Sequence, residues 1–240
     1  IVEECLPLAS LLEEASSFPS KLEEMFLLQK QLNDSTNGKN WELGLNKFNK
    51  EINWLRCIHM EVAELIDSTP WKHWKNINSA PDMNNIHVEL VDIWHFLMSY
   101  ILQETNVPKA VSLVNTHCIY EAAQNIDVNL IIKESEKLSY IALAIETKNM
   151  PSFSGIERFI EQFFRACKSA GLSFSWLQKL YIGKNCLNQF RQDNGYKEGT
   201  YKKVWNGSED NVVMVELLKT IEDVSFDELY EQLKLKYNQN

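Results

Sequence analysis

The segment from residue 84 to 104 constrains the fold more than any other part of the chain. Its apolar positions include Ile86, Leu90, Trp94 and Leu97, and a helical repeat spreads such positions over most of the helix circumference. A helix that is apolar on most sides is buried among other elements. We therefore expect this segment to be the central helix of the fold.

The scarcity of turn-forming residues extends this expectation to the whole chain. Only 8 glycines and 6 prolines occur in 240 residues, and apolar positions elsewhere also recur with helical spacing. No long alternation of apolar and polar residues requires a sheet. The sequence therefore predicts an all-α, multi-helix bundle. Helices are expected at 21–32, 52–68, 84–104, 156–168 and 175–192, with helical patterning over 105–150 and one or two helices over 208–238.

The domain organisation is expected to be simple. Residues 1–20 are mixed in character and contain two prolines, so we interpret them as an N-terminal appendage. Residues 21–240 are expected to form a single all-α domain, in which 21–104 and 171–207 carry the distinctive motifs. Residues 105–170 have helical patterning with little distinctive chemistry and are expected to be a variable helical segment.

Charge and cysteine content argue against several classes of protein. A net charge of −9 argues against broad binding to nucleic acid or to an anionic membrane. The most apolar stretch, Val88–Leu102, contains Glu89, Asp92 and His95, which argues against a membrane span. Five widely spaced cysteines without a CxxC motif do not indicate a disulfide framework or a zinc site. We therefore expect a cytoplasmic protein.

Two acidic pairs, Glu61-x-x-Glu64 and Glu89-x-x-Asp92, lie in strongly apolar surroundings. Residues three apart share one face of a helix, so each pair aims two carboxylates in the same direction. Four acids in a partly buried site repel one another, and a hard divalent cation removes that cost. Because two such pairs occur, a Mg²⁺ or Mn²⁺ site explains them as well as the alternative, in which both pairs simply lie on solvated helix faces.

The segment from Lys184 to Lys203 differs in charge from the rest of the chain. It holds five basic and two acidic residues, a net charge of +3, and several of the few glycines lie in or beside it. Alone, such a segment is more often a solvated loop. Beside a carboxylate site it indicates a polyphosphate ligand, because backbone N–H groups and basic side chains neutralise phosphate charge.

The spacing Asp92-x-x-His95 offers a competing interpretation, a di-iron carboxylate bundle. Such bundles need an inward acid-x-x-His from each of two helices, and this chain has no second one. We therefore interpret His95 as a core histidine or as a residue just outside the metal ligands.

The combined motifs resemble the dimeric, all-α dUTPase family, which is similar to MazG-like nucleotide pyrophosphohydrolases. The resemblance covers about a third of the chain. It is carried by 28–34 (LQKQLND), Thr36-Asn37-Gly38 with Trp41, 61–68 (EVAELIDS), 71–75 (WKHWK), 89–96 (ELVDIWHF), 181–185 (YIGKN), Asn188, and 190–205, which includes FRQ, GYKEG and YKK.

This resemblance implies a MazG-like, all-α fold and hydrolysis of dUTP to dUMP and pyrophosphate, with dUDP as a second substrate. It implies two or more Mg²⁺ ions, which Mn²⁺ can replace, held by Glu61, Glu64, Glu89 and Asp92. Glu61 or Glu64 would be the catalytic carboxylate that orients or deprotonates the attacking water. The resemblance also implies a homodimer, and neither nucleic acid nor a membrane is expected as a partner.

The resemblance further implies a set of substrate-binding residues. An amide offers both a donor and an acceptor, which suits recognition of uracil. The nucleoside positions are Gln29 and Asn33, with Trp41 or Trp71 nearby, and the phosphate or sugar positions are Lys72, Lys184, Asn185, Asn188, Arg191, Tyr196, Lys197 and Lys203. Two alternatives stay open: a pyrophosphohydrolase of another nucleotide, and a non-catalytic helical interaction module.

Overall fold

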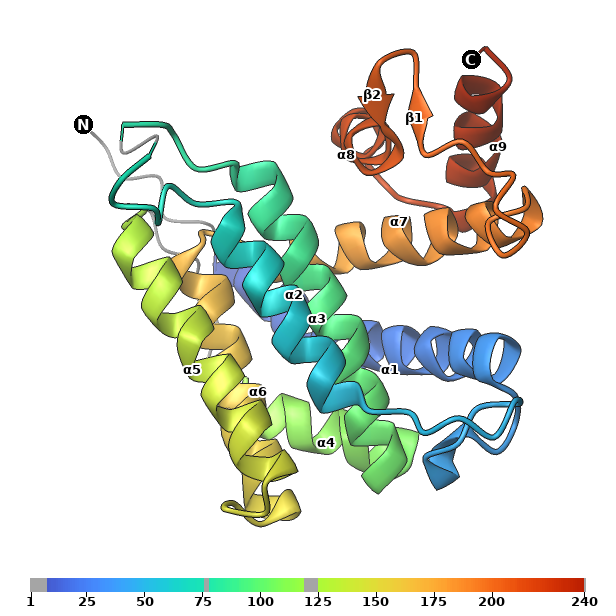
Figure 1. Cartoon of the computed structure of the whole chain (residues 1–240). Coiled ribbons are helices and arrows are strands. Elements are labelled where there is room, and N and C mark those ends of the chain that lie inside the picture. Colours follow the sequence, from blue (N-terminus) through green and yellow to red (C-terminus); the bar gives the residue numbers. More distant parts are fainter. Residues whose placement is uncertain (1–7, 76–77, 119–124, 240) are drawn as a thin grey trace.

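The computed structural model describes residues 8–75, 78–118 and 125–239, and it shows an all-α protein (Figure 1). The fold class predicted from the sequence is confirmed. The elements are α1 (Leu8–Asn37), the 3-10 helix η1 (Trp41–Leu43), α2 (Trp54–Asp67), α3 (Met83–Glu104), α4 (Val107–His117), α5 (Val128–Glu146), α6 (Ser152–Ser169), α7 (Phe174–Asp193), β1 (Val204–Trp205), β2 (Ser208–Glu209), α8 (Asp210–Thr220) and α9 (Phe226–Tyr237).

Helix α3 is the centre of the bundle, as its apolar circumference predicted. It packs against α1, α2, α6 and α7. Its Trp94 is fully buried, stacks on Phe163 with ring centroids 4.9 Å apart, and meets Phe26 of α1 edge-on at 6.1 Å. Across the described ranges, no helix is both long enough and apolar enough to cross a bilayer.

Local sequence signals set where several helices begin. The side chains of Asn53, Asp82 and Ser173 each accept a hydrogen bond from the backbone N–H three residues later, at the starts of α2, α3 and α7. Short polar side chains at this position satisfy donors that have no partner within the helix. The two helices that carry the acidic pairs therefore begin within one or two residues of the predicted positions.

Helix α1 is longer than predicted at both ends. It contains Pro19, crosses the expected boundary between residues 20 and 21 without a break, and ends at Asn37 instead of near residue 32. The polar residues expected to end it are held by tertiary contacts: the Asn33 amide binds Ser99, and the Asp34 carboxylate accepts from Trp41. Residues 1–7 of the expected appendage, and 119–124 of the expected variable segment, lie outside the described residues.

The C-terminal elements gather at the end of α7, away from α5 and α6 (Figure 1). Phe190 of α7 is their centre and contacts the rings of four aromatic residues: Tyr201, Trp205, Tyr230 and Tyr237. Strands β1 and β2, of two residues each, form a small antiparallel hairpin within the all-α fold, too short to appear as an alternation of apolar and polar residues in the sequence. The strands are joined by Asn206-Gly207, whose positive φ angles of 48° and 87° form a two-residue hairpin turn.

Candidate active site

Three of the four predicted metal ligands converge between α2 and α3. Carboxylate oxygens of Glu61, Glu89 and Asp92 all lie within 4.8 Å of one another. Oxygens that share one Mg²⁺ lie about 3–4 Å apart, because each sits about 2.1 Å from the ion. These three residues, called the carboxylate trio below, are close to the spacing that a shared hard cation requires.

The electrostatics of the trio also fit a cation. Burial, and then the neighbouring carboxylates, raise the pKa of both Glu61 and Glu89. The buried Lys184 of α7 places its Nζ 2.8 Å from Oδ2 of Asp92 and offsets part of this negative charge. One ammonium offsets one of the three carboxylate charges, and a divalent cation can neutralise the other two.

Glu64 occupies a different environment. It lies one turn after Glu61 on α2 and is exposed, and it is not one of the three carboxylates that approach one another. Its charge nevertheless acts on Glu61 and Glu89, whose pKa values it helps to raise. Glu64 is therefore a solvated carboxylate at the edge of the trio.

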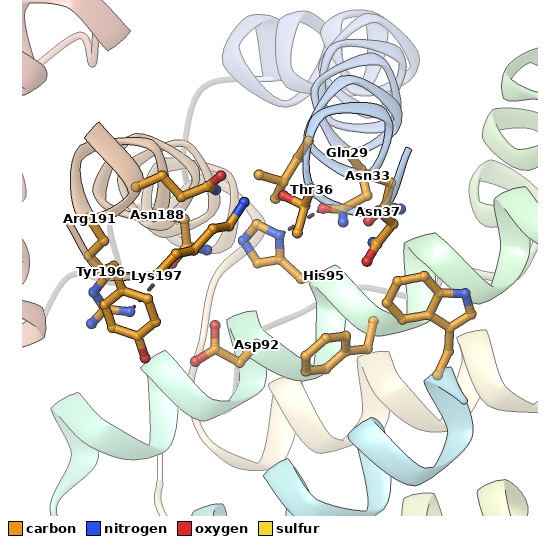
Figure 2. Close-up of a pocket in the computed structure, with 14 residues that line it drawn as sticks. Gln29, Asn33, Thr36, Asn37, Asp92, His95, Asn188, Arg191, Tyr196 and Lys197 are labelled. Carbon is orange, nitrogen blue, oxygen red and sulfur yellow. Dashed lines mark hydrogen bonds between the residues drawn. The ribbon is translucent and has the colours of Figure 1, made fainter. Parts of the chain in front are cut away.

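A cavity of about 410 Å³ opens beside the trio, between α1, α3 and α7. Figure 2 shows Asp92 and His95 of α3 between side chains of α1 and those of α7. Asp92 belongs to both the trio and the cavity wall. The wall is formed by Gln29, Leu32, Asn33, Thr36, Asn37, Trp54, Asp92, His95, Phe96, Asn188, Arg191, Gln192, Tyr196 and Lys197.

Ser99 orients the two amides predicted to read a base. Its hydroxyl donates a hydrogen bond to the backbone oxygen of His95 at 2.8 Å. The hydroxyl oxygen therefore accepts the hydrogen bonds from Nε2 of Gln29 and Nδ2 of Asn33, both at 2.9 Å. All three side chains are buried. Because one hydroxyl holds both nitrogens, the carbonyl end of each amide is also assigned.

The protonation of His95 follows from this arrangement. Gln29 Oε1 lies 2.7 Å from His95 Nδ1 and can only accept, so Nδ1 carries the proton. Burial lowers the pKa of His95 to about 4, which keeps the ring neutral. Its Nε2 is therefore a hydrogen-bond acceptor, and it is buried without a partner.

Two further cavity residues carry buried polar atoms without partners, Thr36 Oγ1 and Trp54 Nε1. Buried polar groups in folded proteins are nearly always paired with protein, water or ligand. In the described part of the chain, five buried side-chain atoms lack partners, and three of them belong to the wall of this one cavity. This concentration makes the cavity the candidate binding site for a polar ligand.

Basic side chains gather at the α7 side of the cavity. Arg191, Tyr196 and Lys197 line the wall, and the Arg191 guanidinium lies over the Tyr196 ring, 5.8 Å from its centroid. Asn188 lies one turn before Arg191 and accepts a long bond from it, 3.4 Å. This cluster can neutralise an anionic group bound next to the trio.

The remaining predicted substrate residues lie outside the cavity wall. Trp41 is fully buried behind Trp54 and donates to Asp34. Trp71 is 42% exposed and, like Lys72, lies on the segment after α2, where both donate to Asp67, the last residue of α2. The others are Lys184, which pairs with Asp92; Asn185, which is buried and donates weakly to Tyr181; and Lys203, which pairs with Glu209 at the hairpin.

Sequence reasoning missed Ser99, Thr36 and Trp54, and it assigned no binding role to His95. Ser99 carried a usable signal, because it is a hydroxyl inside the apolar stretch and lies four residues after His95, on the same helix face. Thr36 lay in the motif that carries the resemblance but was given no role, and Trp54 carried no signal, since their convergence depends on how α1 and α2 each pack on α3.

A family model described as dUTPase matches residues 21–196. The matched range includes the whole trio and every residue of the cavity wall except Lys197. The chain belongs to the all-α dUTPase family. Family membership supports a dUTP diphosphatase-type function, that is, a hydrolase that acts on a nucleotide. No curated protein matches the chain at a significant level.

Proposed function

We propose that this dUTPase-family protein hydrolyses dUTP to dUMP and pyrophosphate, with dUDP as a second substrate. The observation that carries the proposal is the position of Asp92, which belongs both to the carboxylate trio and to a cavity with unpartnered polar atoms. The trio suits a metal and phosphates, and the cavity suits a base. Because the two share Asp92, together they suit a ligand with a base at one end and phosphates at the other.

The chemistry of the cavity supports uracil as the base. The Watson–Crick edge of uracil presents an acceptor, a donor and an acceptor in order. The unpartnered atoms include a donor at Trp54 Nε1, an acceptor at His95 Nε2 and a hydroxyl at Thr36 that can donate. Cytosine keeps one acceptor but replaces the other with a donor and the N–H with an acceptor, so the acceptor His95 Nε2 would face another acceptor.

The trio supports Mg²⁺ as the cofactor, in agreement with the general use of this ion by dUTPases. We assign Glu61, Glu89 and Asp92 as its ligands, because all-oxygen donor sets favour hard cations. Bound there, Mg²⁺ supplies neutralisation of phosphate charge and acidification of water. The raised pKa values of Glu61 and Glu89 are consistent with carboxylates arranged for such a charge.

The proposed hydrolytic step uses side chains at the carboxylate trio and in the cavity wall. A water oxygen attacks the α-phosphorus, and the bond to the oxygen that bridges to the β-phosphate breaks. We assign Glu64 to orient this water and accept its proton, because its carboxylate is exposed beside the trio. Arg191 and Lys197 then neutralise the departing pyrophosphate.

A substrate panel tests the proposal. The purified chain is incubated with dUTP, dUDP, dTTP or dCTP, with Mg²⁺ or with EDTA, and nucleotides and pyrophosphate are quantified by chromatography. We expect dUMP and pyrophosphate from dUTP only when Mg²⁺ is present, and dUMP with phosphate from dUDP. Preferred hydrolysis of dCTP or dTTP would instead support a pyrophosphohydrolase of another nucleotide. No turnover of any nucleotide would support a non-catalytic module.

A homodimer is also proposed, on the resemblance to the dimeric class of this family. Light scattering coupled to gel filtration tests it, with about twice the chain mass expected. A monomeric mass at micromolar concentration would contradict the proposal.

A further inference from the structure

The first turn of α8 holds a fully buried carboxylate that the proposed function does not use. Asp210 is 0% exposed. Arg191 donates to it through Nε to Oδ2 and through Nη2 to Oδ1, both at 2.8 Å. The Tyr201 hydroxyl donates to Oδ2 and the Asn211 backbone N–H to Oδ1, also at 2.8 Å. Four donors thus satisfy the carboxylate completely.

This two-point contact fixes the plane of the Arg191 guanidinium. A planar fork bound along one edge cannot rotate without breaking both hydrogen bonds. The bound edge is the Nε and Nη2 side, which leaves Nη1 with a single long contact of 3.4 Å to Asn188. Because Arg191 also lines the cavity, the geometry leaves Nη1 as the group that can bind a ligand there.

The charges of this contact are stable near neutral pH. Burial alone disfavours an ionised carboxyl, but the hydrogen bonds from Arg191 and Tyr201 outweigh it and hold the pKa of Asp210 below its usual range. Arg191 keeps its charge as well, since the bond to Asp210 overcomes the effect of burial and raises its pKa. Both partners are therefore ionised when a phosphate would bind.

The next residue extends the contact toward the carboxylate trio. Asn211 Oδ1 accepts from Lys184 Nζ at 3.0 Å and from Arg191 Nη2 at 3.4 Å. Lys184 in turn lies 2.8 Å from Asp92. The first turn of α8 thus contacts both basic side chains of α7 that face the site. It lies beyond residue 196, where the family match ends.

We propose that Asp210 is a positioning residue, which holds Arg191 so that its Nη1 edge faces bound phosphate. The inference rests on the proposed function for its substrate and deepens it with a residue outside the family match. A purely structural role, attachment of α8 to α7, would affect stability and not phosphate affinity. The two roles therefore differ in what a substitution changes.

The experiment measures binding of inorganic tripolyphosphate by calorimetry, at one fixed Mg²⁺ concentration, in the full chain. Asp210→Asn should weaken tripolyphosphate binding about tenfold, the loss typical of one misaligned charge-assisted hydrogen bond. Deoxyuridine binding should not change. In an Arg191→Ala background, Asp210→Asn should cause no further loss, because its effect passes through Arg191.

The matched control is Asp193→Asn. Asp193 is the last residue of α7, the helix that carries Arg191, and its carboxylate accepts a 2.7 Å hydrogen bond from Tyr230 of α9. It should leave tripolyphosphate binding unchanged. An equal effect of Asp210→Asn with and without Arg191, no effect at all, or an equal effect of Asp193→Asn would each overturn the proposal.

A second variant covers the case in which circular dichroism shows that Asp210→Asn is unfolded. Tyr201→Phe removes one donor from Asp210 and keeps the ion pair, so a two- to threefold loss is expected, roughly the value of one neutral hydrogen bond. The loss should vanish in the Arg191→Ala background, and its persistence would overturn the inference. Because the readout is tripolyphosphate binding, failure of dUTP hydrolysis alone would count against the proposed function and not against this role.

Discussion

Lys184 places its Nζ 2.8 Å from Oδ2 of Asp92, and both side chains are largely buried. An ammonium from α7 therefore lies at the edge of a cluster of carboxylates from α2 and α3. This contact ties α7, which carries proposed phosphate-binding residues, to α3, which carries two of the three proposed metal ligands. The Lys184 ammonium also neutralises part of the buried negative charge of the trio, and so affects the stability of the fold.

Lys184→Met should destabilise the protein more in EDTA than in Mg²⁺. Removal of one partner of a buried ion pair costs about 3 kcal/mol, because the other charge is left uncompensated. A bound cation would neutralise Asp92 and reduce that loss. Urea unfolding in the two buffers checks this. Lys30→Met, which removes a partly exposed pair with Asp34, is the control and should cost under about 1 kcal/mol in both. Equal losses for Lys184→Met in EDTA and Mg²⁺ would contradict the prediction.

Glu61→Gln and Glu64→Gln should separate metal binding from proton transfer. Both should lower turnover of dUTP, Glu61→Gln by at least about 100-fold, since it removes a proposed ligand. Only Glu61→Gln should abolish the stabilisation by Mg²⁺, because Glu64 lies outside the trio. Thermal denaturation with and without Mg²⁺, measured beside turnover, distinguishes the two roles. Loss of Mg²⁺ stabilisation in Glu64→Gln as well would make Glu64 an equal ligand.

Trp54→Phe should lower kcat/KM for dUTP roughly tenfold, because it removes the unpartnered N–H donor and keeps an aromatic ring. Trp41→Phe is the matched control. The Trp41 N–H is already bonded to Asp34, so its loss should reduce stability and leave KM unchanged. If Trp41→Phe raises KM as much as Trp54→Phe, the base does not bind in the cavity described here.

Ser99→Ala should reduce the preference for dUTP over dCTP. The hydroxyl holds the nitrogens of Gln29 and Asn33. Gln29 Oε1 also accepts from His95 and Tyr181 and keeps its orientation, whereas the Asn33 amide can turn to present the opposite group once the hydroxyl is gone. We expect the ratio of kcat/KM values to fall about tenfold. Thr105→Ala, which removes a hydroxyl that donates to the Ile101 carbonyl at the end of α3, should leave the ratio intact. An unchanged ratio in Ser99→Ala would show that other contacts set the amide orientation.

The contribution of Asp210 to stability should depend on pH. Its pKa is lowered in the folded state, so its ion pair stabilises fully above the unfolded value of about 3.9 and is lost as pH falls through the folded value. Asp210→Asn should therefore cost about 3 kcal/mol at pH 7 and progressively less below pH 4. Urea unfolding at several pH values checks this. A difference from the unsubstituted protein that stays constant down to pH 3 would contradict the assignment.

Local pattern was sufficient to predict the helices and most of the trio. Helix α3 followed from its apolar circumference, and the i, i+3 spacing placed Glu89 and Asp92 on one face. The same spacing also grouped Glu61 with Glu64, yet only Glu61 joins Glu89 and Asp92 in the trio. Periodicity defines a face of one helix but not the angle at which the next helix crosses it, and that angle separates the two acids.

The cavity was harder to predict because its wall comes from α1, α2, α3 and the end of α7. The sequence could not show that Trp54, the first residue of α2, would line it while Trp41 of η1 packs edge-to-face behind Trp54. Nor could it show that Lys184 would pair with Asp92 while Lys197 faces the cavity. Such choices depend on contacts between residues far apart in the chain.

Asp92 and Ser99 lie on the same helix, seven residues apart. At 1.5 Å per residue, the end of the site that faces the metal and the hydroxyl that orders the amides are separated by about 10 Å along two turns of α3. In the proposed binding mode, one rigid element thus sets the span between phosphate and base. Insertion of a single residue between the two would rotate one end by about 100° against the other, so the length of ligand that fits is fixed by the pitch of a helix and not by a movable loop.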